Sequence, residues 1–199
     1  LVSWAEAGLE SGASIAERLR LPTVFHLANS FYESFNTLAL VYFGRLFEMT
    51  AKVLRVVNYG KASANLLYQL KKSGGEVPQA EVHFLILQLL QFVQNCAKQP
   101  RFFTGDRWTL IRQVAIDELE NTKVEGHEAR CTALADALYP ALECHPETLG
   151  DTLQAIMEKV RDGSAKLRYR CLLVVERLTA RIGEGLAPHL PLLMPFLSE

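Results

Sequence analysis

Cysteine and histidine, the residues that most often carry out chemistry, are few and widely spaced in this sequence. The four cysteines, Cys96, Cys131, Cys144 and Cys171, lie 35, 13 and 27 positions apart, without the C-x-x-C pair typical of zinc or redox sites. Cys144 and His145 are adjacent, but neighbours on a helix diverge by about 100° and cannot pair as nucleophile and base. We therefore expect buried thiols in a protein of a reducing compartment.

The sequence also lacks the short motifs that mark common active sites. It contains no G-x-S-x-G, no phosphate-binding G-x-x-x-x-G-K-[ST], no dinucleotide-binding G-x-G-x-x-G, no H-E-x-x-H and no calcium-binding loop. The five histidines are far apart and fall on or beside different predicted helices: His26, His83, His127, His145 and His189. The acids Asp117, Glu118 and Glu120 share one helix end, a pattern typical of a solvated face. We expect no enzymatic activity, no cofactor and no metal site.

Five basic residues form the one local cluster of charge, around a single predicted turn that also contains Tyr169. They are Lys159, Arg161, Lys166, Arg168 and Arg170. Lysines and arginines beside an aromatic ring can contact RNA phosphates and bases. The alternative is a solvated rim in which Arg168 has a structural role. The 21 Lys and Arg against 22 Asp and Glu exclude only a protein that depends on a global basic excess to bind nucleic acid.

Length and composition indicate one globular unit spanning residues 1–199. With 49% hydrophobic residues, a chain of this length buries roughly 70% of its surface on folding and needs no disulfide or metal. The longest apolar run, residues 38–43, is far shorter than the ~18 residues of a spanning helix, so we expect no membrane partner. Because the chain begins without Met and reaches Glu199 in a predicted helix, we expect it to be a piece of a longer protein.

Apolar residues recur at helical spacing along nearly the whole chain, and strict strand-like alternation is absent. The first stripe comprises Val24, Ala28, Phe31 and Phe35, which we expect to be buried. Further stripes lie within residues 39–57, 82–96, 108–119, 131–142, 149–160, 167–182 and 190–197. The helix at 82–96 is so apolar, with Phe84 and Leu87 on its other faces, that it should be buried nearly all round. The pattern predicts an all-α fold.

Short turns between these stripes predict antiparallel helical hairpins, with breaks near Asn36, His145 and Pro146, and Gly163. Hairpins repeated at a period near forty residues predict an α-solenoid, in which each repeat buries its face on the next. Residues 58–79, rich in glycine and lysine, are the predicted flexible insertion. Asp162 in the turn and Arg168 six residues later are candidates for a ladder of hydrogen bonds between repeats.

Three stretches together resemble a known family. Residues 101–121, with a Phe-Phe pair leading to Asp-Glu-Leu-Glu-Asn, and residues 166–199, ending Leu-Pro-Leu-Leu-Met-Pro-Phe-Leu-Ser-Glu, are similar to the C-terminal domain of the family of the tenth U-three small nucleolar RNA-associated protein. Residues 3–6 and 21–57 resemble it more loosely. Residues 58–79 have no clear counterpart, Ala115 stands where the family pattern has a proline-led turn, and the acidic run expected after Glu199 is absent. The Asp162 and Arg168 spacing resembles the signature of HEAT repeats.

The resemblance implies HEAT repeats and a structural role. Such proteins belong to the early, transcription-associated subcomplex of the small-subunit processome in the nucleolus. The implied partners are other processome proteins, pre-ribosomal RNA and the U-three small nucleolar ribonucleoprotein, and direct RNA contact by the basic cluster stays open. The alternative function is a HEAT adaptor of another kind, such as a nuclear transport or phosphatase scaffold, and an enzyme is a distant third.

Overall fold

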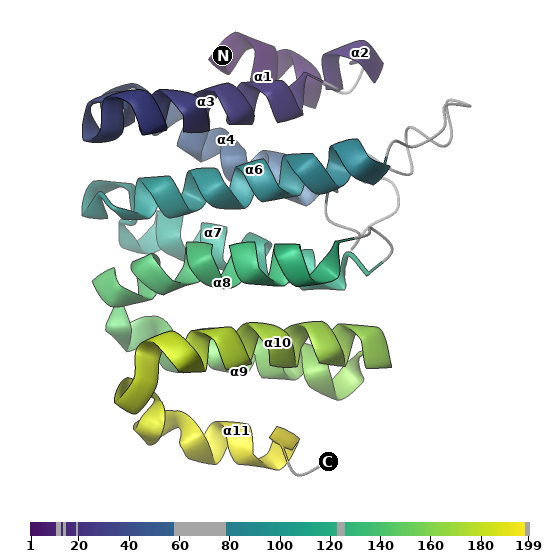
Figure 1. Cartoon of the computed structure of the whole chain (residues 1–199), viewed down its shortest axis with the longest axis vertical. Helices are drawn as coiled ribbons and strands as arrows, with labels where there is room; N and C mark the ends of the chain where they lie inside the picture. Colours follow the sequence, from purple (N-terminus) through teal and green to yellow (C-terminus); the bar gives the residue numbers. More distant parts are fainter. Residues whose placement is uncertain (11–12, 14, 19, 58–78, 123–125, 198–199) are drawn as a thin grey trace.

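The chain forms a stack of helices in two layers (Figure 1). A computed structural model describes residues 1–10, 13, 15–18, 20–57, 79–122 and 126–197. Within these ranges the structure contains α-helices and 3₁₀ turns and no strand. The predicted all-α solenoid is therefore confirmed, while most of the predicted insertion at 58–79 lies outside the described residues and Gln79 begins a helix.

One layer contains four long helices, which lie one above another at the front of Figure 1. They are α3 (Leu21–Phe35), α6 (Gln79–Ala97), α8 (His127–Cys144) and α10 (Ala165–Ile182). Each packs directly on the next, α3 on α6, α6 on α8 and α8 on α10. This order is the layered arrangement in which a repeat contacts only its neighbours.

The second layer lies behind the first and closes each hairpin. It contains α4 (Gly44–Val57), α7 (Gly105–Asp117) and α9 (Leu149–Asp162), with α1 (Val2–Leu9) and the short α2 (Ile15–Arg18) at one end and α11 (Leu190–Leu197) at the other. In the part of the chain that the structure describes, five 3₁₀ turns join or extend the helices: η1 (Asn36–Tyr42), η2 (Pro100–Phe102), η3 (Glu118–Glu120), η4 (Pro146–Thr148) and η5 (Gly183–His189).

A continuous apolar core runs between the layers, and most predicted stripes supply it. Leu138 in α8 and Val174 and Leu178 in α10 are fully or almost fully buried. An aromatic chain joins α4 to α7, since the Phe47 ring packs against Phe103 at 5.3 Å and Phe103 packs edge-on against Trp108 at 5.7 Å between ring centroids. Such edge-to-face pairs add stability beyond their buried area.

The turns before and after α10 have local chemical causes. At its start, the Ser164 hydroxyl accepts a hydrogen bond from the Leu167 backbone N–H, which satisfies one of the unpaired donors of a helix N-terminus. At its end, Gly183 adopts a positive φ of 58°, a conformation that favours glycine and ends the helix.

The structure corrects several details of the predicted burial. Phe31 and Phe35 are 47% and 56% exposed, because no described helix covers the outer side of α3 at its C-terminal end. Phe84 of α6 is also partly exposed, so that helix is not buried all round. The predicted turn near Asn36 is instead the 3₁₀ segment η1, and the next helix begins only at Gly44.

Three of the four cysteines, Cys96, Cys131 and Cys171, are buried as predicted, whereas Cys144 is exposed at the end of α8. Burial raises the pKa of the Cys171 thiol to about 12, which keeps it protonated. Among the described helices, none is long and apolar enough to cross a membrane.

Truncation of core leucines tests this packing. Leu138→Ala and Leu178→Ala should each lower the free energy of unfolding by about 2–5 kcal/mol, because each removes buried methyl groups and leaves a cavity. Lys52→Ala, at an exposed position of α4, should change it by less than about 0.5 kcal/mol. Urea denaturation of the three variants provides the measurement, and equally small losses at all three positions would contradict the core described here.

Candidate functional site

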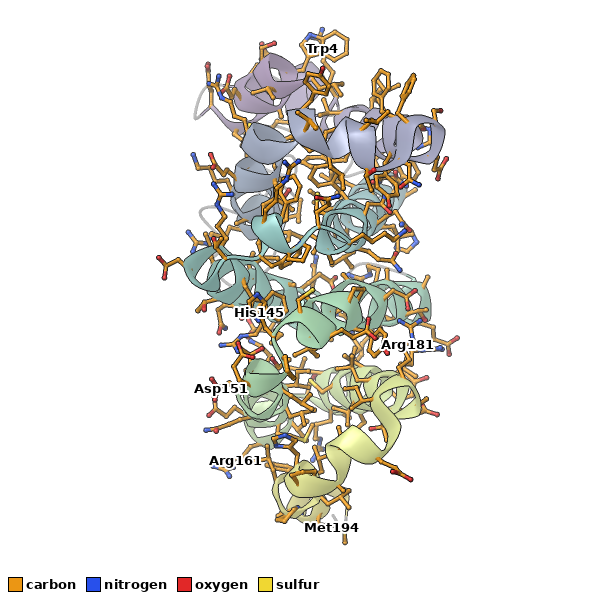
Figure 2. The ribbon with its side chains drawn as sticks, turned by 90° about the vertical axis from the view of Figure 1, so that its left-hand side faces the viewer. Trp4, His145, Asp151, Arg161, Arg181 and Met194 are labelled. Atoms are coloured by element: carbon orange, nitrogen blue, oxygen red, sulfur yellow. The ribbon has the colours of Figure 1, made fainter. Side chains whose placement is uncertain are left out.

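The predicted basic cluster surrounds the turn between α9 and α10, but the structure divides it into exposed and internal members. Arg161, Lys166 and Arg168 are exposed. The Arg161 guanidinium lies 6.0 Å from the centroid of the Phe196 ring in α11, and Figure 2 shows Arg161 on the α9 side of the stack. These three residues form the basic turn, the exposed part of the cluster.

Lys159 is mostly withdrawn from solvent. Its side chain is 13% exposed, and its Nζ donates hydrogen bonds to Asp117 Oδ1 at 2.8 Å and to a carboxylate oxygen of Glu120. Burial alone would lower the pKa of Lys159, but the hydrogen bonds and negative charges of the two acids raise it overall. Lys159 therefore stays charged and links α9 to the end of α7 through these ion pairs.

Arg170 does not lie on the predicted partner surface, which corrects that assignment. Its side chain is fully buried, and its Nη2 donates to Glu118 Oε2 at 2.7 Å. Its Nη1 donates to the backbone carbonyl oxygens of Leu119 at 2.6 Å and Glu118 at 3.3 Å. Arg170 therefore ties α10 to η3, immediately after α7.

Glu118 and Arg130 complete a buried ion-paired cluster. Arg130 of α8 is fully buried and donates through Nη1 to the other carboxylate oxygen of Glu118 and through Nη2 to the Asn121 backbone oxygen at 3.1 Å. The Asn121 side-chain amide in turn donates to the Val57 carbonyl oxygen of α4 at 3.2 Å. The Glu118 carboxylate thus bridges α8 and α10, and the cluster extends to a helix of the preceding hairpin.

Two histidines flank this cluster, although the sequence places them 44 positions apart. His127 Nδ1 lies 3.1 Å from Arg130 Nη2, so the neutral ring can accept a hydrogen bond from the guanidinium. His83 of α6 packs against Gly126, which has a positive φ of 74° and leaves no room for a side chain. Glycine is therefore required here for its conformation and its lack of a Cβ.

The cluster is electrostatically unbalanced. One carboxylate faces two guanidinium groups, and burial raises the pKa of Glu118 while the charges and hydrogen bonds of both arginines oppose that rise. Burial, followed by the nearby positive charges of Lys166, Arg170 and Arg130, lowers the pKa of His127 to about 4. Burial and the charge of Arg130 lower the pKa of His83. Both imidazoles are thus neutral at pH 7, which avoids adding positive charge.

This arrangement joins helices through buried charged groups. Among the described residues, no group of three or more His, Cys, Asp or Glu side chains could hold a metal ion. The predicted ladder pair remains a prediction, because Arg168 is exposed and the Asp162 side chain lies outside what the structure describes. Glu118, Arg130 and Arg170 supply fully buried hydrogen bonds that join successive helices.

A signal for these residues exists in the sequence. Arg130 and Arg170 each lie four residues before a buried leucine or valine, and Glu118 lies four residues after a buried valine. Arg130-Cys131 and Arg170-Cys171 are the same dipeptide forty residues apart, which matches the repeat period. A charge at a core position requires a buried partner, so this register predicts an internal ion pair.

Comparison with known proteins finds one matching domain family and several similar proteins. A family model described as the BP28CT (NUC211) domain matches residues 1–102. The sequence resemblance rested mainly on the second half, so the two observations support each other from different parts of the chain. No solved structure gave a significant match.

Three curated relatives align with nearly the whole chain. The HEAT repeat-containing protein 1 homolog of Caenorhabditis elegans is 45% identical over 205 residues, which covers 100% of this chain and 12% of that protein. HEAT repeat-containing protein 1 of Homo sapiens is 26% identical, and the alignment covers 92% of this chain and 9% of that protein. U3 small nucleolar RNA-associated protein 10 of Chaetomium globosum is 22% identical, and the alignment covers 100% of this chain and 11% of that protein. The chain therefore spans about a tenth of the length of these relatives.

The lowered pKa of His127 predicts a loss of stability in acid. The folded-state pKa of His127, about 4, lies below the ordinary value of 6.5, so between these pH values the unfolded chain binds more protons than the folded one. Stability contributed by neutral His127 should therefore fall as pH drops from about 6.5 to about 4. His127→Asn should remove part of this fall, measured as the urea midpoint at several pH values. His26→Asn, an exposed position on α3, should retain the wild-type pH dependence, and identical curves for all three proteins would contradict the proposed effect.

Proposed function

Because this chain belongs to the BP28CT (NUC211) domain family, we propose that it is a non-catalytic scaffold in ribosome biogenesis. It forms the C-terminal domain of a large HEAT-repeat protein. In this proposal the full-length protein acts in the nucleolus, within the small-subunit processome, and supports early assembly of pre-ribosomal RNA and processing of small-subunit ribosomal RNA. The name of the Chaetomium relative, a U3 small nucleolar RNA-associated protein, is the observation that carries the proposal.

The geometry suits a scaffold. A two-layer stack presents long, continuous side surfaces, and the described charged groups inside it serve to join successive helices. The proposed partners are the proteins of the early transcription-associated subcomplex, with pre-ribosomal RNA and the U-three small nucleolar ribonucleoprotein present in the same assembly.

The surface proposed to contact a partner is the basic turn of Arg161, Lys166 and Arg168. All three are exposed, and Tyr169, which follows Arg168, is 52% exposed beside them. Exposed cations next to an accessible ring can bind RNA phosphate and stack on a base, and the same groups can pair with an acidic protein surface. Arg170 and Lys159 are excluded from this surface because their charges are already paired inside the fold.

Depletion and rescue in cells test this function. Loss of the full-length protein should lower small-subunit ribosomal RNA and accumulate uncleaved precursor, with a smaller effect on large-subunit RNA, as measured by RNA blotting. Full-length protein carrying Lys166→Glu and Arg168→Glu should restore processing less than the wild-type protein does. Less precursor RNA should also co-purify with this variant.

The matched control reverses two exposed charges elsewhere. Lys52→Glu with Arg55→Glu, on the outer side of α4, should rescue as well as wild type. Equal rescue by both double variants would remove the basic turn from the proposal. A normal precursor pattern after depletion would remove the ribosome-assembly role and favour a HEAT adaptor of another kind, whose purified complexes would contain nuclear transport cargo or phosphatase subunits.

A further inference from the structure

The outer side of α3 carries an apolar stripe that nothing in the described structure covers. Leu27, Phe31 and Phe35 are spaced four residues apart and so lie along one side of the helix, and they are 37%, 47% and 56% exposed. The adjoining η1 continues this surface with three more large exposed apolar residues, Leu38, Val41 and Tyr42. A contiguous patch of this kind marks an interaction site.

This patch borders a groove of about 780 Å³ between α1, α3, η1 and the start of α4. Its apolar lining includes Leu1, Val2, Phe31, Phe35, Leu38 and Tyr42. An ion pair between Arg45 and Glu6, with a distance of 2.5 Å between Nη2 and Oε1, also borders the groove. The groove is therefore an apolar trough with a charged border, which fits an amphipathic helix.

The position of the groove in the stack shows that α3, in the described structure, lacks a front-layer packing neighbour on one side. Within the front layer α6 and α8 each pack on a front helix at both sides, whereas α3 packs on α6 alone. Figure 1 shows α1 above only part of α3, and Figure 2 shows Trp4 of α1 at the same end of the molecule. At the opposite end, η5 packs on α10 and α11 packs on α9. The apolar pattern of α3 is thus that of an internal helix of the stack.

We propose that this groove receives a helical segment from the part of the full-length protein that precedes Leu1. Leu1 and Val2 line the groove themselves, so a preceding segment starts at its edge. The relatives are far longer than this chain, since the aligned region is 12% of the worm protein and 9% of the human protein. The inference concerns packing within the protein and does not depend on the ribosomal function.

Photo-cross-linking in the full-length protein tests the occupant. A photoreactive phenylalanine analogue replaces Phe35 in the groove, and in a matched control it replaces Phe84, a partly exposed phenylalanine of α6. After irradiation, mass spectrometry identifies the cross-linked peptides. Position 35 should cross-link to residues that precede Leu1, at a yield at least five times that of position 84 for the same peptides.

A mixture of isotopically light and heavy protein shows whether the cross-link lies within one molecule. Light-to-light and heavy-to-heavy products alone support the proposal, whereas mixed products would assign the groove to a second copy and overturn it. Cross-links to another protein, or the absence of any cross-link, would also overturn the proposal. The same analogue at Tyr42, which is 83% exposed, provides a second position if the change at Phe35 prevents folding.

Discussion

The arrangement of the second half of the stack depends on one buried carboxylate. Glu118 accepts hydrogen bonds from Arg130 and Arg170, whose side chains, like its own, have no exposed surface. Removing one member would leave the other charges buried without compensation, a cost far greater than that of losing an exposed ion pair. Because α8 and α10 each contribute one arginine, neither can slide or rotate without separating charges. The interaction therefore fixes the register between successive helices, which apolar packing alone specifies less strictly.

This constraint also determines which charges of the basic cluster face solvent. Lys159 and Arg170 have their charges compensated within the fold, so only Arg161, Lys166 and Arg168 remain exposed around the turn between α9 and α10. His127 must stay neutral beside the arginines, which couples the internal cluster to pH. The stack thus separates charges that hold helices together from charges that face solvent, and its apolar residues are similarly divided between the core and the groove above α3.

Sequence periodicity predicted the helices, the absence of strands from the described residues and most of the core, because a 3.6-residue period follows directly from which residues are buried. It was wrong where burial depends on a neighbour: Phe31 and Phe35 have the pattern of core residues but face an open groove. The ion-paired cluster was missed because grouping charges by their distance along the chain placed Arg170 with Arg168. The Arg-Cys dipeptide that recurs forty residues apart at Arg130 and Arg170 is the sequence feature that distinguishes Arg170 from Arg168. The contact between His127 and Arg130, and its effect on pH, needs the three-dimensional structure.

A double-mutant cycle on Glu118 and Arg170 tests the central claim most directly. Glu118→Gln and Arg170→Met are made singly and together, and urea denaturation gives the free energy of unfolding of each protein. We predict that each single change costs about 3–5 kcal/mol and that the double change costs at least about 2 kcal/mol less than their sum, because the two groups compensate each other. The exposed acid Glu120, changed to Gln, should cost less than about 1 kcal/mol. Additive losses within about 0.5 kcal/mol would contradict the account.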